Sequence, residues 1–226
     1  MFMEKQVISK QRVADHGEVL TGQREVNAML DLVKQETERI DSRFLEPACG
    51  NGNFLAVILE RKLLVVEKRY GKSQLDFERY AVLAVSSIYG IDIQEDNVIE
   101  CQGRLYSVFD GTYTRLFKKK AKDKCREAVR FILGKNILCG NALTLMTEDT
   151  PSQPIIFAYW ALVGGKFTRA DYAFQDLSQP GPESMPDLFA QQRGIVDRDI
   201  GDKGFIPEPI RTDYPPVPYW ELKNVK

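Results

Sequence analysis

The chain has few of the residues that build metal sites or disulfide frameworks. It contains one His, His16, and its four Cys stand apart with no C-x-x-C pair: Cys49, Cys101, Cys125 and Cys139. We therefore expect no bound metal. We expect the thiols to be reduced and mostly buried, as is usual in a cytoplasmic protein.

Long apolar runs are absent as well. The sequence shows neither an apolar signal region near its start nor a segment long and apolar enough to span a bilayer, so we expect no membrane partner. Hydrophobic residues make up 43% of the chain and charged residues 28%, which excludes a disordered chain and predicts a globular protein with a sizeable core.

An excess of positive charge is also missing. The formal net charge is −1, so the chain as a whole lacks the basic surface typical of nucleic-acid-binding proteins. Any contact with DNA must come from a local patch or from a partner protein. The basic run at residues 115–124, with Tyr113 and Phe117 nearby, could contact phosphates. A solvated helix end is the alternative reading of this run.

The order of the predicted elements is that of an α/β protein. Apolar periodicity predicts helices and strands in alternation, which favours parallel β-α-β units. Helices are expected at 23–40, from 53, at 75–87, 95–117 and 123–133, and Gly134 is placed as a C-cap of the last of these. Strands are expected at 43–48, 88–93 and 136–140.

The pattern changes in the last third of the chain. Residues 155–162 and 166–174 predict a hairpin around Gly164-Gly165, with aromatic residues that either form a surface or pack in the core. We expect a loop or partly disordered segment at 179–204 and extended, polyproline-like chain at 205–220. The sequence thus divides into residues 1–150 and a small irregular β-containing C-terminal appendage, residues 151–226.

The most informative segment is a glycine-rich turn between the first predicted strand and its helix. Such a turn leaves backbone N–H groups free at the helix N-terminus, and glycine lets a ligand approach the backbone closely. Gly50 and Gly52 have no third glycine after them, so the G-x-G-x-x-G dinucleotide pattern is absent. The full segment is Leu45-Glu46-Pro47-Ala48-Cys49-Gly50-Asn51-Gly52-Asn53-Phe54.

This segment resembles motif I of class I AdoMet-dependent methyltransferases, and most of all that of the amino-group (N6-adenine type) DNA methyltransferases. The resemblance covers roughly residues 12–145 and implies a Rossmann-like class I methyltransferase sheet that binds S-adenosyl-L-methionine (AdoMet). It implies that Glu46 receives the ammonium group and that Phe54 packs against the cofactor. The backbone around Pro47, Ala48, Gly50 and Gly52 would approach its amino-acid half. A tight turn without a ligand is the alternative.

The same resemblance gives roles to residues at the ends of the next two strands. Asp92, followed by Ile93, would accept the ribose hydroxyls, because a carboxylate offers two acceptor oxygens; a helix N-cap is the alternative. Asn141, followed by Ala142, would accept from the adenine amino group, or would be a turn residue. Upstream, the segment containing Thr21 resembles the motif that precedes motif I, with Leu20 and Gly22 in place of Phe and Pro. His16 is expected to be structural.

The motif that performs the chemistry of this family is missing. Asn/Asp-Pro-Pro-aromatic normally holds the exocyclic amine of a flipped base and stacks on it. The nearest strings, Asp213-Tyr214-Pro215-Pro216 and Pro216-Val217-Pro218-Tyr219, differ from it and stand in the Pro-rich tail. The catalytic residues therefore stay unassigned.

Two hypotheses follow. The first is an AdoMet-dependent DNA adenine-N6 methyltransferase of the restriction-modification or phage-related kind. The second is a catalytically incomplete AdoMet-binding subunit, whose partner chain supplies the Asn-Pro-Pro-Tyr loop and DNA recognition. A methyltransferase for RNA, protein or a small molecule is a third reading, against which the Glu-Pro-Ala-Cys-Gly-Asn-Gly string and the Thr21 region argue.

Overall fold

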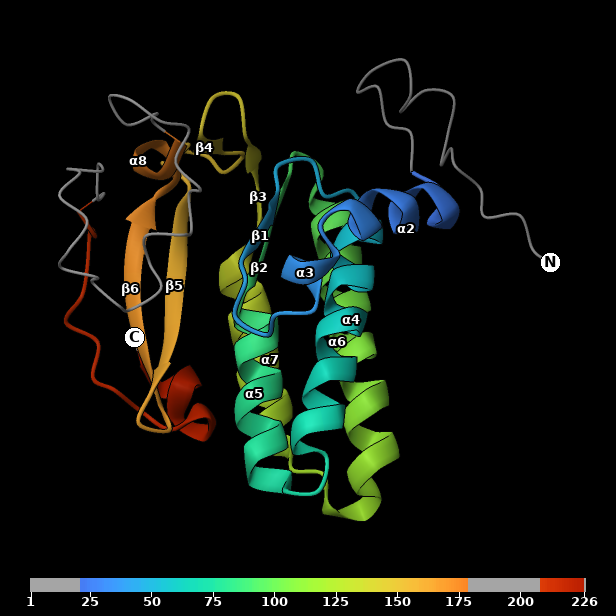
Figure 1. Cartoon of the computed structure of the whole chain (residues 1–226). Helices are drawn as coiled ribbons and strands as arrows, with labels where there is room; N and C mark the ends of the chain where they lie inside the picture. The colour runs from blue at the N-terminus through green and yellow to red at the C-terminus, as the bar shows by residue number, and fades with distance from the viewer. Residues whose placement is uncertain (1–20, 179–207, 226) are drawn as a thin grey trace, which may run out of the picture.

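The structure is a computed structural model, and it describes residues 21–178 and 208–225. Figure 1 shows the chain from the N-terminal helices to the C-terminal segment. His16 and the loop expected at 179–204 lie outside the described residues.

A small mixed sheet forms the upper part of the molecule in Figure 1. Its strand order is β1-β2-β3-β4, in which the first three strands are parallel and the last is antiparallel. This confirms the α/β class. The bounds are β1 (Phe44–Glu46), β2 (Ile88–Asp92), β3 (Ile137–Asn141) and β4 (Met146–Thr147), of which β4 was not predicted.

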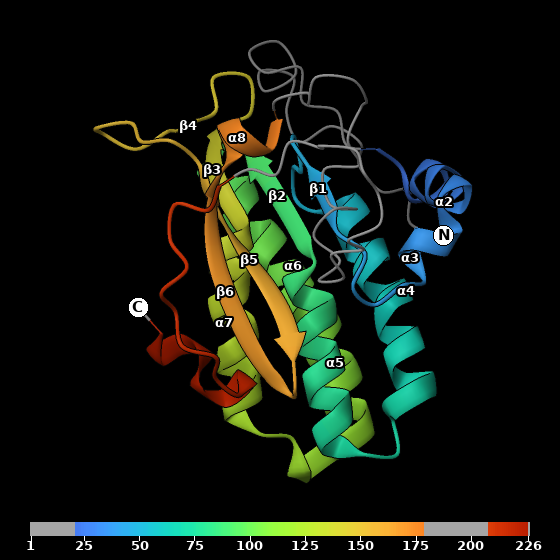
Figure 2. The same cartoon turned by 60° about the vertical axis from the view of Figure 1, so that its left-hand side comes forward.

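Each connection between parallel strands is a helical hairpin. One helix runs down from the carboxyl end of a strand, and the next returns and passes almost directly into the following strand (Figure 2). The second helix predicted between the first two strands is therefore confirmed. The first hairpin consists of α4 (Asn53–Tyr70) and α5 (Gln74–Ser86), and the second of α6 (Glu95–Phe117) and α7 (Asp123–Asn136).

These four helices pack as a bundle that extends beyond the sheet. Ser73 begins α5 with a side-chain cap, accepting a hydrogen bond from the Asp76 N–H at 3.4 Å. Phe77, Phe109 and Tyr113 are completely buried between the helices. Their rings lie 5.4 to 6.0 Å apart, so aromatic packing holds the part of the bundle farthest from the sheet.

The predicted hairpin is confirmed as β5 (Ile156–Val163) and β6 (Lys166–Ala173), with Gly164 and Gly165 both at positive φ. Tyr89 on β2 donates a hydrogen bond to the Ala158 carbonyl at 3.1 Å, and Trp160 donates to the Asn136 side chain at 3.0 Å. Trp160 is 1% exposed. The hairpin thus packs on the α/β unit, and its central aromatic residue belongs to the core.

The C-terminal segment lies along the hairpin. Val217 pairs with Phe167 through two backbone hydrogen bonds, and Tyr214 donates its hydroxyl hydrogen to Asp171 at 2.7 Å. The expectation of extended chain holds for residues 208–218 but is wrong at its end, where η3 (Tyr219–Asn224) packs on α7. The short helix α8 (Phe174–Ser178) follows β6.

The single helix expected at 23–40 is two helices, α2 (Gln23–Leu32) and α3 (Lys34–Thr37). Two cations on α4 explain the break. Arg61 binds Asp31 on α2, while the buried Lys62 donates to the carbonyls of Arg39 and Ile40 beyond α3. Burial lowers the pKa of Lys62 to about 7. These two sets of contacts fix different parts of residues 23–40, so this segment cannot continue as one straight helix.

The placement of Gly134 as a C-cap is also wrong, because α7 continues to Asn136. The Asn136 side chain is fully buried and donates to the carbonyls of Ser86 and Ile88, both at 3.1 Å. These contacts hold the last turn of α7 against the start of β2.

None of the helices within residues 21–178 and 208–225 combines the length and the apolar character needed to cross a bilayer.

Candidate functional site

The glycine-rich turn stands where β1 ends and α4 begins. Gly50 and Gly52 have φ of 51° and 86°, and the Gly52 N–H donates to the Cys49 carbonyl at 2.9 Å. The N–H of Cys49 donates to the Ile91 carbonyl at 2.9 Å, which ties the turn to β2. No side chain caps the N-terminus of α4. The turn therefore presents backbone groups at the carboxyl edge of the sheet.

Gly52 has a structural requirement of its own. A Cβ at this position would lie 2.7 Å from the Cys101 Sγ on α6, closer than real contacts allow. Its positive φ also disfavours any residue with a side chain. Both reasons act inside the protein, so Gly52 fixes the turn against α6 whether or not a ligand lies outside.

Asp92, at the carboxyl end of β2, faces this turn. Its Oδ2 accepts the Gly50 N–H at 2.8 Å, and its Oδ1 accepts the Gln94 N–H at 2.9 Å and the Asn97 side chain at 3.1 Å. The residue is 7% exposed. A carboxylate has about four acceptor positions, so the three bonds leave one free, on Oδ2. Asp92 thus orders the turn and holds Gln94 and Asn97 in place at the start of α6.

A second carboxylate, Glu46, lies close to the turn. Glu46 is half-buried, and burial raises its pKa although the Ala48 N–H stabilises the charged form. The pKa of Cys49 is raised by its hydrogen bond with Cys101, by burial, and by the nearby charges of Asp92 and Glu46. Two carboxylates therefore lie near Cys49 in the turn, an arrangement that favours a cationic ligand.

Asn51 is a site residue that the sequence analysis missed. Its Nδ2 donates to Glu100 on α6 at 3.1 Å, whereas its Oδ1 is buried and accepts no hydrogen bond from the described residues. An unsatisfied buried oxygen is costly, and a bound donor at the turn would satisfy it. Asn97, the side-chain donor to Asp92, was missed too. Both Asn51 and Asn97 look like ordinary helix-end residues in the sequence.

Thr21 and Phe54 lie at the start of α4. The Asn53 side chain donates to the Thr21 carbonyl at 3.1 Å and accepts a hydrogen bond from Arg104 on α6. Phe54 is half-buried against the main core. The structure therefore brings the Thr21 region next to the turn, as the sequence analysis expected. Pro47 and Ala48 are exposed at its outer side.

The remaining predicted residues stand farther along the sheet edge. Ile93, directly after β2, is 47% exposed. Asn141 ends β3, and its Oδ1 accepts the N–H groups of Leu143 and Thr144 at 2.9 and 3.3 Å. This is the turn role left open above, and it occupies the oxygen that would meet an adenine amino group. Ala142 packs against the small core under the hairpin.

The Pro-rich strings do not reach this site. Tyr214 is bound to Asp171 on β6, and Asp213 pairs with Arg211 at 2.7 Å. Figures 1 and 2 place this segment along β6, on the side of the hairpin away from β1.

Comparisons with protein-family models, with curated proteins and with solved structures found no match. Among the residues that the structure describes, no cluster of three or more His, Cys, Asp and Glu side chains is placed to hold a metal ion.

Proposed function

We propose that the chain binds AdoMet at the turn from Glu46 to Phe54 and serves in methylation of adenine N6 in DNA. The observation that carries this proposal is the hydrogen bond between the Gly50 N–H and Asp92. It joins the two elements that the sequence resemblance assigns to one cofactor, the motif I turn and the acid after the second strand. Parallel strands with ligand groups at their carboxyl ends are the usual setting for such a site.

The donor and acceptor set fits a ligand with a cationic amino-acid end. Glu46 and Asp92 would supply negative charge, and the unsatisfied Oδ1 of Asn51 would accept an N–H hydrogen. The free acceptor position of Asp92 would take one ribose hydroxyl, and the second hydroxyl would compete with the Gly50 N–H. Bound AdoMet supplies an electrophilic methyl group on its sulfonium.

The second candidate is an AdoMet-binding subunit without turnover of its own. One observation favours it: in the described part of the chain, the parallel strands end with β3, and the antiparallel β4 follows. A loop that holds an exocyclic amine for attack follows a fourth parallel strand in the family that the sequence resembles. A partner chain would then supply that loop together with DNA recognition.

Calorimetric titration of the purified chain with AdoMet tests what both candidates share. We expect saturable binding, weakened when Asp92 is replaced. Absence of binding by a folded chain would overturn both candidates.

Transfer of labelled methyl groups from AdoMet to DNA separates the two. Because the sequence holds no Asn/Asp-Pro-Pro-aromatic motif, we expect the chain alone to label DNA slowly or not at all. Addition of the neighbouring gene products should restore labelling. Robust labelling by the single chain would instead favour the complete enzyme.

A further inference from the structure

The far end of the helical bundle concentrates positive charge. The turn between α4 and α5 and the turn between α6 and α7 meet there, at the bottom of Figure 1. Residues 67–76 and 114–124, which we call the basic end, hold nine Lys and Arg against three Asp and Glu. Their net charge is +6 in a chain whose formal net charge is −1.

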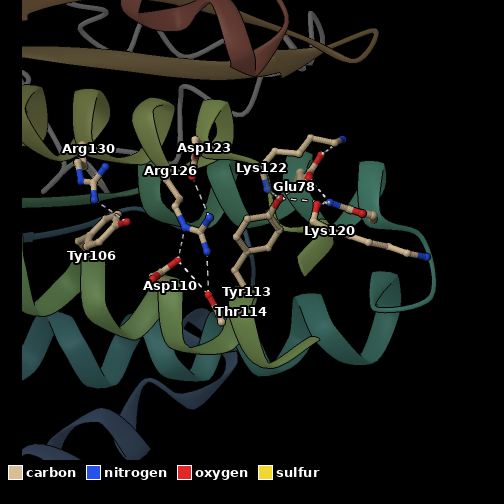
Figure 3. A network of polar contacts seen from close by, with 11 residues as sticks. Glu78, Tyr106, Asp110, Tyr113, Thr114, Lys120, Lys122, Asp123, Arg126 and Arg130 are labelled. Carbon is tan, nitrogen blue, oxygen red and sulfur yellow. Dashed lines mark hydrogen bonds and ion pairs between the residues drawn. The ribbon is translucent and has the colours of Figure 1, made fainter. Parts of the chain in front are cut away.

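Specific contacts join the two turns into one surface. Gln74 donates to the Lys120 carbonyl at 2.7 Å, and Arg115 makes a two-bonded ion pair with Glu67 at 2.6 and 2.9 Å. Lys122 binds the buried Glu78 at 3.0 Å (Figure 3). The relative positions of the cations on the two turns are therefore set by the fold.

Most of these cations have no counterion among the residues that the structure describes. Lys118, Lys119 and Lys120 are consecutive and exposed, and Lys120 extends away from the polar network in Figure 3. Among the described residues, no ion pair involves these three side chains, nor those of Lys68, Arg69, Lys72 and Lys124. Close, unpaired like charges repel one another, and a polyanion would remove that repulsion.

Helix stability does not explain the whole cluster. Lys68, Arg69 and Arg115 stand in the last turns of α4 and α6, where a cation is favourable. Lys72 and Lys124 instead stand beside or in the first turns of α5 and α7, where a cation is unfavourable. Lys118 also has a φ of 50°, which is uncommon for a residue with a side chain.

The aromatic residues at or beside the basic end pack against other rings of the protein. Tyr113, next to the second basic turn, is completely buried, whereas Phe117 and Tyr70 are half-buried. Phe117 packs against Phe77 at 5.2 Å between ring centroids, and Tyr70 stacks on Tyr80. A surface that binds single strands presents free rings for base stacking, and a surface that inserts into a membrane presents several apolar side chains. Within residues 67–76 and 114–124, Leu75 is the one exposed large aliphatic side chain, at 40%. A surface of exposed lysines whose neighbouring rings pack on one another fits the phosphate backbone of a duplex.

This surface lies far from the glycine-rich turn. Helix α4 has 18 residues and leads from one to the other, which corresponds to about 27 Å at 1.5 Å per residue. A duplex held at the basic end is therefore not held at the carboxyl edge of the sheet by the same contacts.

We propose that the basic end is a nucleic-acid anchoring surface, which binds the phosphodiester backbone of a duplex without reading its sequence. The inference goes beyond the AdoMet site and stands without it. Three adjacent lysines that each neutralise one phosphate would account for a salt slope of about 2.7, since each contact contributes about 0.9.

Fluorescence anisotropy with a labelled DNA duplex of about 20 base pairs, at several salt concentrations, tests the proposal. The variant is Lys118→Gln/Lys119→Gln/Lys120→Gln in the full chain. We expect an affinity at least tenfold lower and a salt slope lower by about two to three. The matched control is Lys34→Gln/Lys135→Gln/Lys166→Gln, which removes the same charge from exposed positions elsewhere; it should change affinity by less than about threefold.

The outcomes separate this proposal from its rivals. Equal loss in both variants would mean that only overall charge matters, and an unchanged triple variant would mean that the surface is not used; either overturns the proposal. Tighter binding to phosphatidylserine vesicles than to DNA would overturn it in favour of a membrane surface. The same titration with an RNA duplex in place of the DNA duplex shows which nucleic acid the surface prefers. AdoMet titration of the same variant reads the cofactor site separately, so the proposed function and the anchoring surface can fail independently.

Discussion

Asp92 and Glu78 are buried carboxylates at opposite ends of the helices, and they are satisfied in different ways. Asp92 accepts two backbone N–H groups and one amide. Glu78 accepts only side-chain donors, and its own side chain is 0% exposed. The donors to Glu78 come from α5, α6, the start of α7 and the C-terminal segment: Gln74, Tyr113, Lys122 and Tyr219.

The difference indicates what each carboxylate is for. Because backbone N–H groups donate to Asp92, this residue organises the turn and the start of α6. One acceptor position remains for a ligand. Glu78 instead accepts hydrogen bonds from side chains of several segments, and these bonds fix η3 to the bundle. Burial alone raises the pKa of Glu78, but its hydrogen bonds from Tyr113, Tyr219, Lys122 and Gln74 lower it overall. The first carboxylate organises a candidate site, and the second holds the fold together.

The largest loss of stability should come from neutralising Glu78. Glu78→Gln removes the charge that four donors share and leaves Lys122 without its partner, so we expect the free energy of unfolding to fall by about 3 kcal/mol. Urea denaturation measures this loss. The matched control is Glu127→Gln, whose exposed ion pair with Lys223 should contribute less than about 1 kcal/mol. Equal losses in the two variants would contradict the role assigned to Glu78.

The pH dependence of the free energy of unfolding, compared between wild type and Glu78→Gln, tests the same role of Glu78. Because the folded pKa of Glu78 lies below the ordinary value of 4.5, the unfolded chain takes up this proton more readily. The stability that Glu78 contributes is therefore present above about pH 4.5 and is lost as pH falls through the folded pKa. We expect the difference between wild type and Glu78→Gln to shrink steadily below pH 4.5. A constant difference down to pH 3 would contradict the assignment.

A smaller loss is expected at the turn that Asp92 shapes. Gly52→Ala introduces a Cβ at φ 86° and 2.7 Å from the Cys101 Sγ, which should lower the free energy of unfolding by about 2 kcal/mol. In a Cys101→Ala background the contact disappears, and about 1 kcal/mol of backbone strain should remain. Gly103→Ala on α6 meets no atom within 4 Å and should be stabilising. Urea denaturation of wild type, Gly52→Ala, Cys101→Ala, the double variant and Gly103→Ala gives the comparison.

The smallest effect concerns ligand affinity. Asp92→Ala should weaken AdoMet binding at least tenfold, about 1.4 kcal/mol, because a charged acceptor of the ribose is lost. Calorimetry is done on variant protein shown to be folded by circular dichroism. The control Glu95→Ala changes an exposed carboxylate three residues away, and its affinity should stay within about twofold. If AdoMet binds both variants equally well, Asp92 has only the structural role that the comparison with Glu78 shows.

Local periodicity predicted most elements well. The bounds of α6 were predicted as observed. Strand β5 differs from the prediction by one residue at each end, and β6 differs by one residue at its carboxyl end only. The errors fall where distant contacts act. Lys62 and Arg61 divide the first helix, and Asn136 extends α7 past Gly134. No local pattern carries that information, because each partner is more than twenty residues away.

For the candidate site, the sequence predicted the turn and the acid after the second strand but not the contacts among them. Asn51 and Asn97 were missed because an amide at a helix start has an ordinary capping role. For Asn141 the sequence left two roles open, an acceptor for the adenine amino group of the cofactor or a turn residue. In the structure its side chain stabilises a turn.

The sequence by itself determined the alternation of strands and helices, the glycine-rich turn and the charge of the two helical turns, because these depend on residues close together in the chain. Only the tertiary structure decided that Asp92 faces Gly50, that Glu78 joins four segments, and that both basic turns form one surface. Such contacts link residues tens of positions apart. Their geometry is fixed by the packing of whole helices against the sheet, which no local pattern specifies.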